Sequence, residues 1–402
     1  MTKCSQKSLL SQIPSTVWAI GVVTLLINLS SIVIFSLSPL YMTQVFGLAT
    51  LELGLLEGVI ESFSWFTRIF AGVISDYLHK RKPILIIAYA LTALSRPVFA
   101  LAPSLGWIYG ARLTDRISNG LQATPREALV GDVAPQNLKG ACYGLRQTLS
   151  LVGSLLGALG VMYLMRHTGN DYEFIFFLAC IPPVLALVAL ILFVQDSTPS
   201  HAQQREKPSQ KISWINISRL KRQYWAVILV AAVFMVSNYS GVYMILQAER
   251  QGLSPAEVPI VMVIQNLCAM LSAFPIGRLS DVVDRRILLA VGFSITILSN
   301  LFLGFANGIF FVMIGAALWG AQIGINQSLL LTKVADTTPQ SLRGTGFGIY
   351  YLTNGIALFI SNSFTGWLFQ TYGSVWAFMG SSIIAGVALL LLPLLKPFQK
   401  TL

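Results

Sequence analysis

One short pattern occurs twice in this chain, about 205 residues apart. It consists of a glycine, an acidic residue four positions later and a terminal pair of basic residues: Gly72, Asp76, Lys80 and Arg81 in the first copy, and Gly277, Asp281, Arg285 and Arg286 in the second. A second landmark, Pro135–Gly140, recurs at an offset of 204 as Pro339–Gly344. Two landmarks at nearly the same offset indicate an internal duplication. The chain is therefore predicted to fold as two homologous halves.

The composition indicates that both halves lie in a membrane. Hydrophobic residues make up 55% of the chain and charged residues only 11%, whereas soluble domains have about 25% charged residues. A helix that crosses a bilayer needs about 20 mostly apolar residues. Twelve such segments are predicted, at 17–44, 50–75, 83–103, 107–129, 141–165, 174–195, 223–248, 256–280, 287–306, 309–333, 342–370 and 374–396. We expect an all-α membrane protein with twelve transmembrane helices in two six-helix lobes related by pseudo-symmetry.

The predicted domain organisation follows from the one long polar stretch. Residues 1–195 form the first lobe, 196–222 form a linker, and 223–402 form the second lobe. The linker contains Pro199 and Pro208 and several basic residues. It is interpreted as a solvated tether.

The distribution of lysine and arginine predicts the orientation. If both termini are cytoplasmic, the inner loops carry nearly all the loop cations, and Arg166 and Arg250 are the outer exceptions. This is the positive-inside pattern of multi-pass membrane proteins. The net charge of +11 is then explained by topology, and no nucleic-acid partner is expected. The first apolar segment is too long for a removed signal peptide and is interpreted as a retained helix.

No motif for catalysis, a metal or a cofactor is recognised. The four cysteines and three histidines are scattered and form no CxxC or other metal-binding spacing. No GxxxxGK[ST] phosphate-binding loop occurs. The chain is therefore predicted not to be an enzyme, to bind no cofactor and to use no nucleotide.

The repeated pattern resembles the loop signature of the major facilitator superfamily, and the resemblance covers essentially the whole chain. Tyr77, His79 and Asp284 depart from the residues usual in that signature. The helix-four pattern of the family, Arg-x-x-polar-Gly, is matched by Arg116, Asn119 and Gly120. The stretch 112–144 resembles a bacterial subgroup whose members mostly have no assigned substrate, some being associated with drugs or siderophores.

The resemblance implies a secondary transporter that works by alternating access, with a substrate site between two lobes. It also implies gating roles for Asp76 and, by the repeat, for Asp281, together with the glycines and basic residues of both copies. A helix-end charge that only fixes topology is the alternative for Asp76. The glycines at 153, 157 and 160 match half of the antiporter signature, without its proline, and small residues also permit close helix packing.

The first half carries charged residues inside predicted helices, where they are costly unless they are paired or functional. Helical spacing places Glu57 and Glu61 on one stripe and Arg112 and Arg116 on another. At equal depths these form two predicted ion pairs, Glu57 with Arg112 and Glu61 with Arg116. Because an ion pair shifts the pKa of a carboxyl, we expect proton coupling by these four residues and Asp115. The alternative is a static lock between the two helices.

Two further arginines, Arg68 and Arg146, have no acidic residue at their depth in the predicted helices. Guanidinium groups bind carboxylate or phosphate in bidentate fashion, so these arginines favour an anionic solute. Alternatively, their long side chains extend to the cytoplasmic interface. The second half offers neutral polar candidates for the same substrate site: Gln265, Asn266, Asn326, Gln327, Tyr350 and Asn354.

Three functions are compatible with these features. The first is a monomeric, proton-coupled transporter for a small organic anion, polycarboxylate or siderophore-like, in a bacterial-type inner membrane. The second is a multidrug–proton antiporter that exports lipophilic compounds. The third is a non-transporting sensor or lipid-handling protein with the same fold. The arginine excess favours the first, and both import and export are compatible with it.

Overall fold

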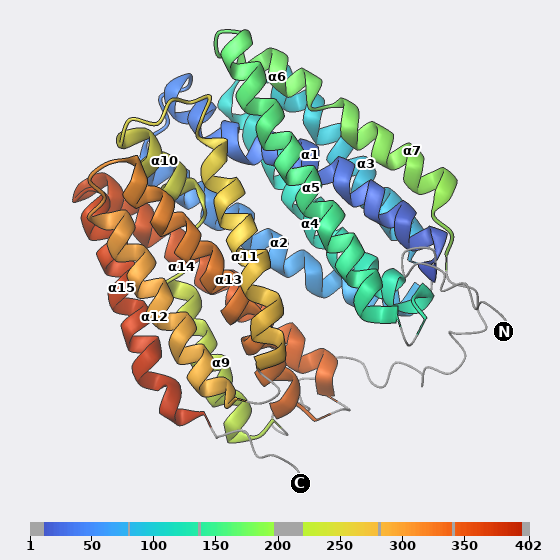
Figure 1. The fold of residues 1–402 in the computed structure, drawn as a ribbon, viewed down its shortest axis with the longest axis vertical. Helices are drawn as coiled ribbons and strands as arrows, with labels where there is room; N and C mark the ends of the chain where they lie inside the picture. Colours follow the sequence, from blue (N-terminus) through green and yellow to red (C-terminus); the bar gives the residue numbers. More distant parts are fainter. Residues whose placement is uncertain are drawn as a thin grey trace, which may run out of the picture.

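The computed structural model describes residues 12–78, 81–135, 138–196, 220–279, 283–339 and 342–395. All regular structure in these residues is helical. The helices form two groups, which meet at one end and diverge toward the other (Figure 1). Most packing contacts fall within residues 15–193 or within residues 222–394. These two groups are called the first and the second lobe below.

The first lobe contains six spans in seven helices: α1 (Ser15–Gln44), α2 (Thr50–Leu78), α3 (Lys82–Ala100), α4 (Leu105–Val133), α5 (Lys139–His167), α6 (Tyr172–Leu178) and α7 (Ile181–Phe193). The predicted sixth span is correct in position but is broken between α6 and α7. Pro182 and Pro183 cause this break, because proline lacks the amide N–H that an uninterrupted helix needs. At the first turn of α7 the same prolines are tolerated, since amide groups there have no partner within the helix.

The second lobe also contains six spans: α9 (Arg222–Val236), α10 (Val242–Arg250), α11 (Pro259–Leu279), α12 (Arg285–Gly304), α13 (Ile309–Thr337), α14 (Arg343–Thr371) and α15 (Ser374–Leu391), which ends in the short 3₁₀ helix η5 (Leu392–Leu394). The seventh span was predicted as one helix over 223–248, and the structure corrects this. It is broken between α9 and α10, at residues 237–241. The side chains of Ser237 and Asn238 both donate to the carbonyl of Phe234. These local side-chain bonds compete with the helical pattern and so end α9.

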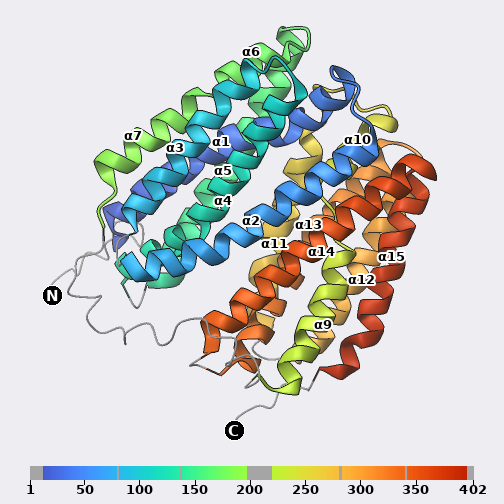
Figure 2. The same ribbon diagram turned by 180° about the vertical axis from the view of Figure 1, so that it is seen from behind.

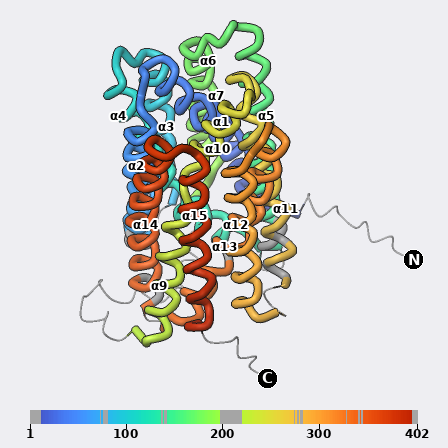
Figure 3. The backbone as a smooth tube through the Cα atoms, turned by 90° about the vertical axis from the view of Figure 1, so that its left-hand side faces the viewer, coloured from blue at the N-terminus to red at the C-terminus, as the bar shows by residue number. Residues whose placement is uncertain are grey.

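Seven helices, with α6 and α7 taken together, are long and apolar enough to cross a membrane by themselves. Helices α2 and α4 are not among them, because each carries several charged residues. Helices α9, α12 and α15 lie on the side of the second lobe that faces away from the first (Figure 3). Together the described elements form the twelve spans of the predicted all-α membrane fold.

The two ends of the bundle differ. The largest apolar cluster joins both lobes, from Ile34 and Phe176 of the first to Tyr243 and Phe369 of the second. It lies toward the end that carries Gln44, Arg166 and Glu249, which we call the sealed end. The opposite end, which carries Arg81, Asp132 and Arg285, is called the basic end.

The main contact between the lobes runs along α2 and α14, which lie side by side (Figure 2). Gly54 and Gly366 permit this approach, because a Cβ built on Gly54 would lie 3.0 Å from the Cα of Gly366. Further along, Ser62 donates to the carbonyl of Gly355 at 2.6 Å. Helices α5 and α11 form a second, smaller contact. Backbone-to-backbone packing through glycine is typical of helix pairs in membranes.

Two of the three α5 glycines that match the antiporter signature have a packing function. A Cβ on Gly153 would lie 2.2 Å from the carbonyl oxygen of Leu25, and one on Gly157 would lie 2.4 Å from that of Leu29, both in α1. A Cβ on Gly160 would meet nothing within 4 Å. The packing interpretation is therefore confirmed for Gly153 and Gly157.

We predict that Gly153→Ala lowers the melting temperature of the purified protein, whereas Gly160→Ala does not. The added methyl group of the first variant collides with α1 backbone, which cannot rotate away, and overpacking typically costs about 1–3 kcal/mol. The second variant gains helix propensity without a collision. Equal melting temperatures for the two variants would contradict the packing assigned to Gly153.

Candidate functional site

Buried ion pairs occupy the interior of the first lobe. Glu57 of α2 lies 2.5 Å from Arg112 of α4, and Glu61 lies 3.6 Å from Arg116. Both contacts agree with the pairs predicted from helical spacing. They connect α2 to α4 at two successive turns.

A third pair joins α3 to α4. Asp115 lies 2.9 Å from Arg96, which also donates to Ser31 of α1 at 3.0 Å. Three carboxylates thus face three guanidiniums, and this central charge cluster is neutral as a whole: Glu57, Glu61, Asp115, Arg96, Arg112 and Arg116. A neutral set of pairs reduces the cost of burying each ion.

The two pairs between α2 and α4 differ in accessibility. The side chains of Glu57 and Arg112 are 0% and 3% exposed, whereas those of Glu61 and Arg116 are 21% and 19% exposed. The longer, more accessible Glu61 pair is suited to proton exchange. The short, fully buried Glu57 pair is suited to holding elements in place.

Glu57 also connects the two lobes. Its Oε2 accepts a hydrogen bond from the Ser240 hydroxyl at 2.9 Å, and Ser240 lies in the break between α9 and α10. Arg112, Glu57 and Ser240 thus form a continuous link from α4 to the second lobe, which we call the Glu57 bridge. A hydrogen bond to an ionised acceptor is about twice as strong as a neutral one.

The broken segment that carries Ser240 is held by the second lobe. The Ser240 amide donates to Asn362 of α14 at 2.7 Å, and the Tyr239 hydroxyl donates to Asn300 of α12 at 2.7 Å. Asn238 accepts from Gln322 of α13 at 3.1 Å. Asn238, Tyr239 and Ser240 are thereby tied to α13, α12 and α14, respectively. Sequence spacing did not identify this segment, because it contains no charge and no proline.

The structure corrects the prediction that Arg146 has no acidic partner. Arg146 lies 3.0 Å from Glu127 of α4 and donates to Gln147 at 3.0 Å. Arg68 stacks over the Trp65 ring at 4.8 Å, and among the described residues no ion pair is seen for it. Glu127 lies inside the predicted fourth span (107–129) as well as inside α4 (Leu105–Val133), but it was not counted among the charged residues of that span.

The neutral candidates of the second lobe do not converge on one point. Asn326 donates to Gln322 and so joins the network of the broken segment. Asn266 bonds the carbonyl of Met262 in its own helix, and Gln327 is exposed. Gln265 is half-buried in α11, and Tyr350 and Asn354 are buried in α14. Among the described residues, no hydrogen bond joins these six to Arg68 or Arg146.

Two of the predicted gating residues, Arg81 and Arg285, lie at the basic end. Arg81 contacts the Ser75 hydroxyl and forms an ion pair with Asp132 at 3.6 Å. Arg285 forms an ion pair with Asp336. Both partners in the second pair are 204 positions beyond those in the first, so the duplication preserved the contact. The sequence contained this signal for Asp132 and Asp336, although neither was predicted.

The remaining gating candidates are described only in part. Gly72 lies in α2, where an added Cβ would approach Thr124 of α4 at 3.4 Å. Arg286 pairs with Asp284, whose side chain also accepts from the Arg286 amide and so begins α12. Lys80 and Asp281 lie outside the described residues, and of Asp76 and Gly277 only the helical backbone is described.

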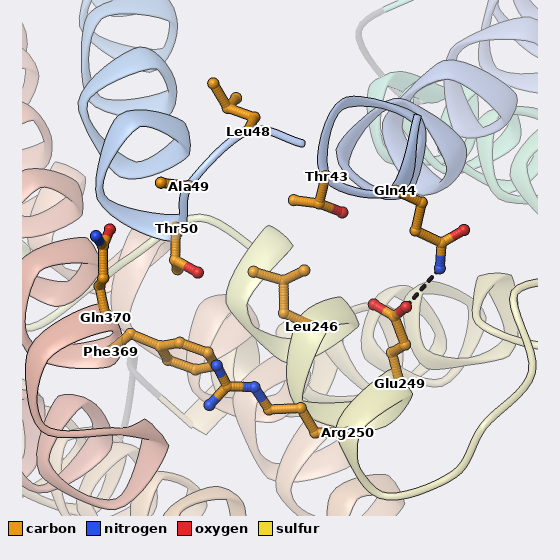
Figure 4. A pocket seen from close by; sticks show the side chains of 10 residues that line it. All are labelled: Thr43, Gln44, Leu48, Ala49, Thr50, Leu246, Glu249, Arg250, Phe369 and Gln370. Carbon is orange, nitrogen blue, oxygen red and sulfur yellow. Dashed lines mark hydrogen bonds between the residues drawn. The ribbon is translucent and has the colours of Figure 1, made fainter. Parts of the chain in front are cut away.

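A shallow pocket of about 470 Å³ lies between the lobes at the sealed end (Figure 4). Gln44 of α1 donates to Glu249 of α10 across it at 2.5 Å, and Arg250 stacks over Phe369 of α14 at 4.2 Å. On its rim, the Leu51 amide donates to Gln370 at 2.7 Å. The Gln44–Glu249 and Leu51–Gln370 hydrogen bonds thus connect the two lobes independently of the Glu57 bridge.

A charged contact completes the sealed end. Arg166 of α5 lies 2.5 Å from Glu257, which follows α10, and Glu257 also accepts from Ser254 at 2.8 Å. The Ser254 hydrogen bond and the Arg166 guanidinium hold the pKa of the Glu257 carboxyl below its ordinary value of 4.5. The contact is therefore fully charged at neutral and mildly acidic pH.

We predict that Ser240→Ala loosens the sealed end. The variant removes a hydrogen bond to an ionised group, which typically contributes about 1.5–3 kcal/mol. Amide hydrogen exchange in α10 and in the first turns of α2 should accelerate by roughly tenfold or more. Ser237→Ala is the matched control, because the buried Ser237 hydroxyl bonds only to its own helix. Equal exchange in the two variants would show that the Glu57 bridge does not hold the lobes.

A second prediction concerns pH. A carboxyl with a lowered pKa stabilises the closed contact above its ordinary pKa, and this stabilisation is lost as pH falls through the lowered value. The melting temperature of Glu257→Gln should therefore lie below that of wild type at neutral pH, and the difference should shrink only below about pH 4.5. Glu173→Gln, which changes an exposed carboxylate in α6, should show no such difference. A difference that persists at acidic pH would contradict the assignment.

Comparisons with known proteins identify the family. The family model described as Major Facilitator Superfamily matches residues 20–251 and 226–401. An uncharacterized MFS-type transporter of Methanocaldococcus jannaschii is 25% identical, with 94% of this chain and 95% of that protein covered. A POT family transporter in complex with a thioalcohol-conjugated peptide has a TM-score of 0.78 at 13% identity, covering 95% of this chain and 98% of that one.

The human organic anion transporter MFSD10 has a TM-score of 0.65 at 15% identity, with 96% of this chain and all of that chain covered. At these identities the two solved structures show a shared fold. The family match, by contrast, extends over both lobes of the sequence. This chain belongs to the Major Facilitator Superfamily of membrane transporters.

Proposed function

We propose that this protein moves a small organic anion across a bacterial-type inner membrane by proton-coupled alternating access. The observation that carries the proposal is the Glu57 bridge. A carboxylate that is buried among arginines of one lobe and bonded to the other lobe links its own charge state to lobe closure. Protonation removes that charge and weakens both contacts.

Glu61 is the proposed point of proton exchange. It lies one turn from Glu57 on α2 and is the more accessible of the two. The charges of Glu57, Glu61 and Asp115 all act on Arg116. Adding a proton to Glu61 leaves the central charge cluster with one excess positive charge, which changes the attraction between Arg112 and Glu57. A proton can thereby affect the bridge without reaching it.

The proposed orientation places the basic end in the cytoplasm, according to the positive-inside rule. The protein is then closed toward the outside, and its lobes diverge toward the cytoplasm (Figure 1). Arg81–Asp132 and Arg285–Asp336 each tie helices within one lobe at that end. These pairs can therefore remain intact while the lobes move relative to each other.

An anionic substrate is proposed because guanidiniums outnumber carboxylates in the interior of the first lobe. The related fold of an organic anion transporter is consistent with this proposal. Arg68 and Arg146 remain candidate contacts, although Arg146 is paired in this state. A lipophilic cation as the transported solute would instead favour the multidrug antiporter.

The test is solute flux in proteoliposomes under an imposed pH gradient. Glu61→Gln and Glu57→Gln should each abolish gradient-driven accumulation of the transported anion while solute exchange at equal pH persists. The amide keeps the shape of the carboxyl but cannot take up a proton. Full accumulation in both variants would exclude the two residues from proton coupling.

A further inference from the structure

A second charge cluster lies nearer the basic end of the first lobe, and its charges are not balanced. It comprises Arg68 of α2, Arg126 and Glu127 of α4, and Arg146 of α5, and we call it the arginine cluster. Glu127 lies 3.0 Å from Arg146 and 3.6 Å from Arg126. The charge of Arg126 acts on both Arg68 and Arg146. Arg126 and Arg146 thus share one carboxylate, and Arg68, on which the charge of Glu61 also acts, has no ion pair among the described residues.

The arginine cluster also contains unused hydrogen-bond donors. The Nε–H groups of Arg68, Arg126 and Arg146 are buried and have no partner in the described part of the chain. Buried donors are normally satisfied, because leaving one unpaired costs about 1–3 kcal/mol. A ligand with several acceptor oxygens would satisfy these donors and neutralise the two uncompensated charges.

Glu127 differs from the carboxylates of the central charge cluster. Its side chain is 39% exposed, whereas Glu57 is fully buried. A carboxylate that is partly in water can leave its arginines at a small cost, because an exposed ion pair contributes little and the carboxylate is hydrated once it is free. Its present contacts with Arg126 and Arg146 are those that a substrate carboxylate would make.

The arginine cluster adjoins the contact between the lobes. Arg68 stacks on Trp65, and the Trp65 ring packs on Tyr351 of α14 with their centroids 5.7 Å apart. A ligand at Arg68 would therefore be placed beside the second lobe. This position allows binding to affect lobe movement.

We propose that Arg68, Arg126 and Arg146 bind a dianion, such as a dicarboxylate or a phosphate-bearing solute, and that Glu127 occupies part of this site when it is empty. The ligand displaces Glu127 from Arg146, and Glu127 turns into water. This inference rests on the proposed function, since it names the charge class of the transported solute. It also assigns roles to Arg126 and Glu127, which neither motif nor repeat indicated.

The experiment measures binding of succinate and of inorganic phosphate to the full-length protein in nanodiscs of zwitterionic lipid. Glu127→Gln removes the internal competitor and should raise the affinity for either probe about tenfold. Arg126→Ala should lower it about tenfold, and Arg126→Lys should restore only part, because lysine keeps the charge but not the planar donors. Glu173→Gln, at the sealed end, should leave the affinity unchanged.

Two results would overturn the inference. One is unchanged or weaker binding in Glu127→Gln, which would make Glu127 a structural tie. Glu127→Asp, which keeps the charge and shortens the reach, serves as a second variant and should raise the affinity by a smaller factor. The other is binding seen only with phosphatidylglycerol in the nanodisc, which would assign the arginine cluster to a lipid headgroup.

The outcomes also separate this inference from the proposed function. Probe binding that is lost in Arg146→Ala but unaffected by Glu127→Gln would refute the internal competitor and leave an anion transporter. Proton-coupled flux of a cationic solute, with no probe bound by any variant, would refute both the dianion site and the proposed substrate class.

Discussion

The arrangement of this protein depends on one buried carboxylate. The Glu57 side chain is fully buried, where it contacts Arg112 and accepts a hydrogen bond from Ser240. Removing either partner would leave a buried charge incompletely compensated, which is costly. Because the two partners belong to different lobes, the same electrostatic requirement that keeps Glu57 buried also keeps the sealed end closed. The outer contacts at Gln44 and Arg166 add to this closure.

The two lobes share a fold but divide the chemistry between them. The first lobe holds a neutral central charge cluster and, nearer the basic end, an arginine cluster with an excess of positive charge. The second lobe offers hydroxyls and amides at the broken segment of residues 237–241. At the position equivalent to Arg116 it has Gly320, which packs on the backbone of Gln265. The interior charges thus lie mainly in the first lobe, and the second lobe contributes neutral hydrogen-bonding partners.

Much of the fold and part of the site could be predicted from sequence. The duplicated pattern and the apolar segments were sufficient for twelve spans in two groups, and helical spacing was sufficient for the Glu57–Arg112 and Glu61–Arg116 pairs. Ser240 could not be found in this way, because periodicity within a helix does not indicate which distant segment faces it. Glu127 lay inside the predicted fourth span, but it was not counted among the interior charges, so Arg146 was predicted to have no acidic partner. The Asp132 and Asp336 contacts were available from the offset of 204.

The most direct test of this account is the distance between the lobes at the sealed end as a function of pH. Spin labels at Val45, at the end of α1, and at Tyr372, which follows α14, would report it, since both side chains are exposed. We expect this distance to lengthen as pH is lowered while Glu257 stays ionised. In Glu57→Gln we expect a distance that is longer on average than in wild type at neutral pH and that no longer changes with pH. A short distance that is independent of pH in wild type, or a closed Glu57→Gln variant, would contradict the claim that Glu57 couples proton binding to lobe closure.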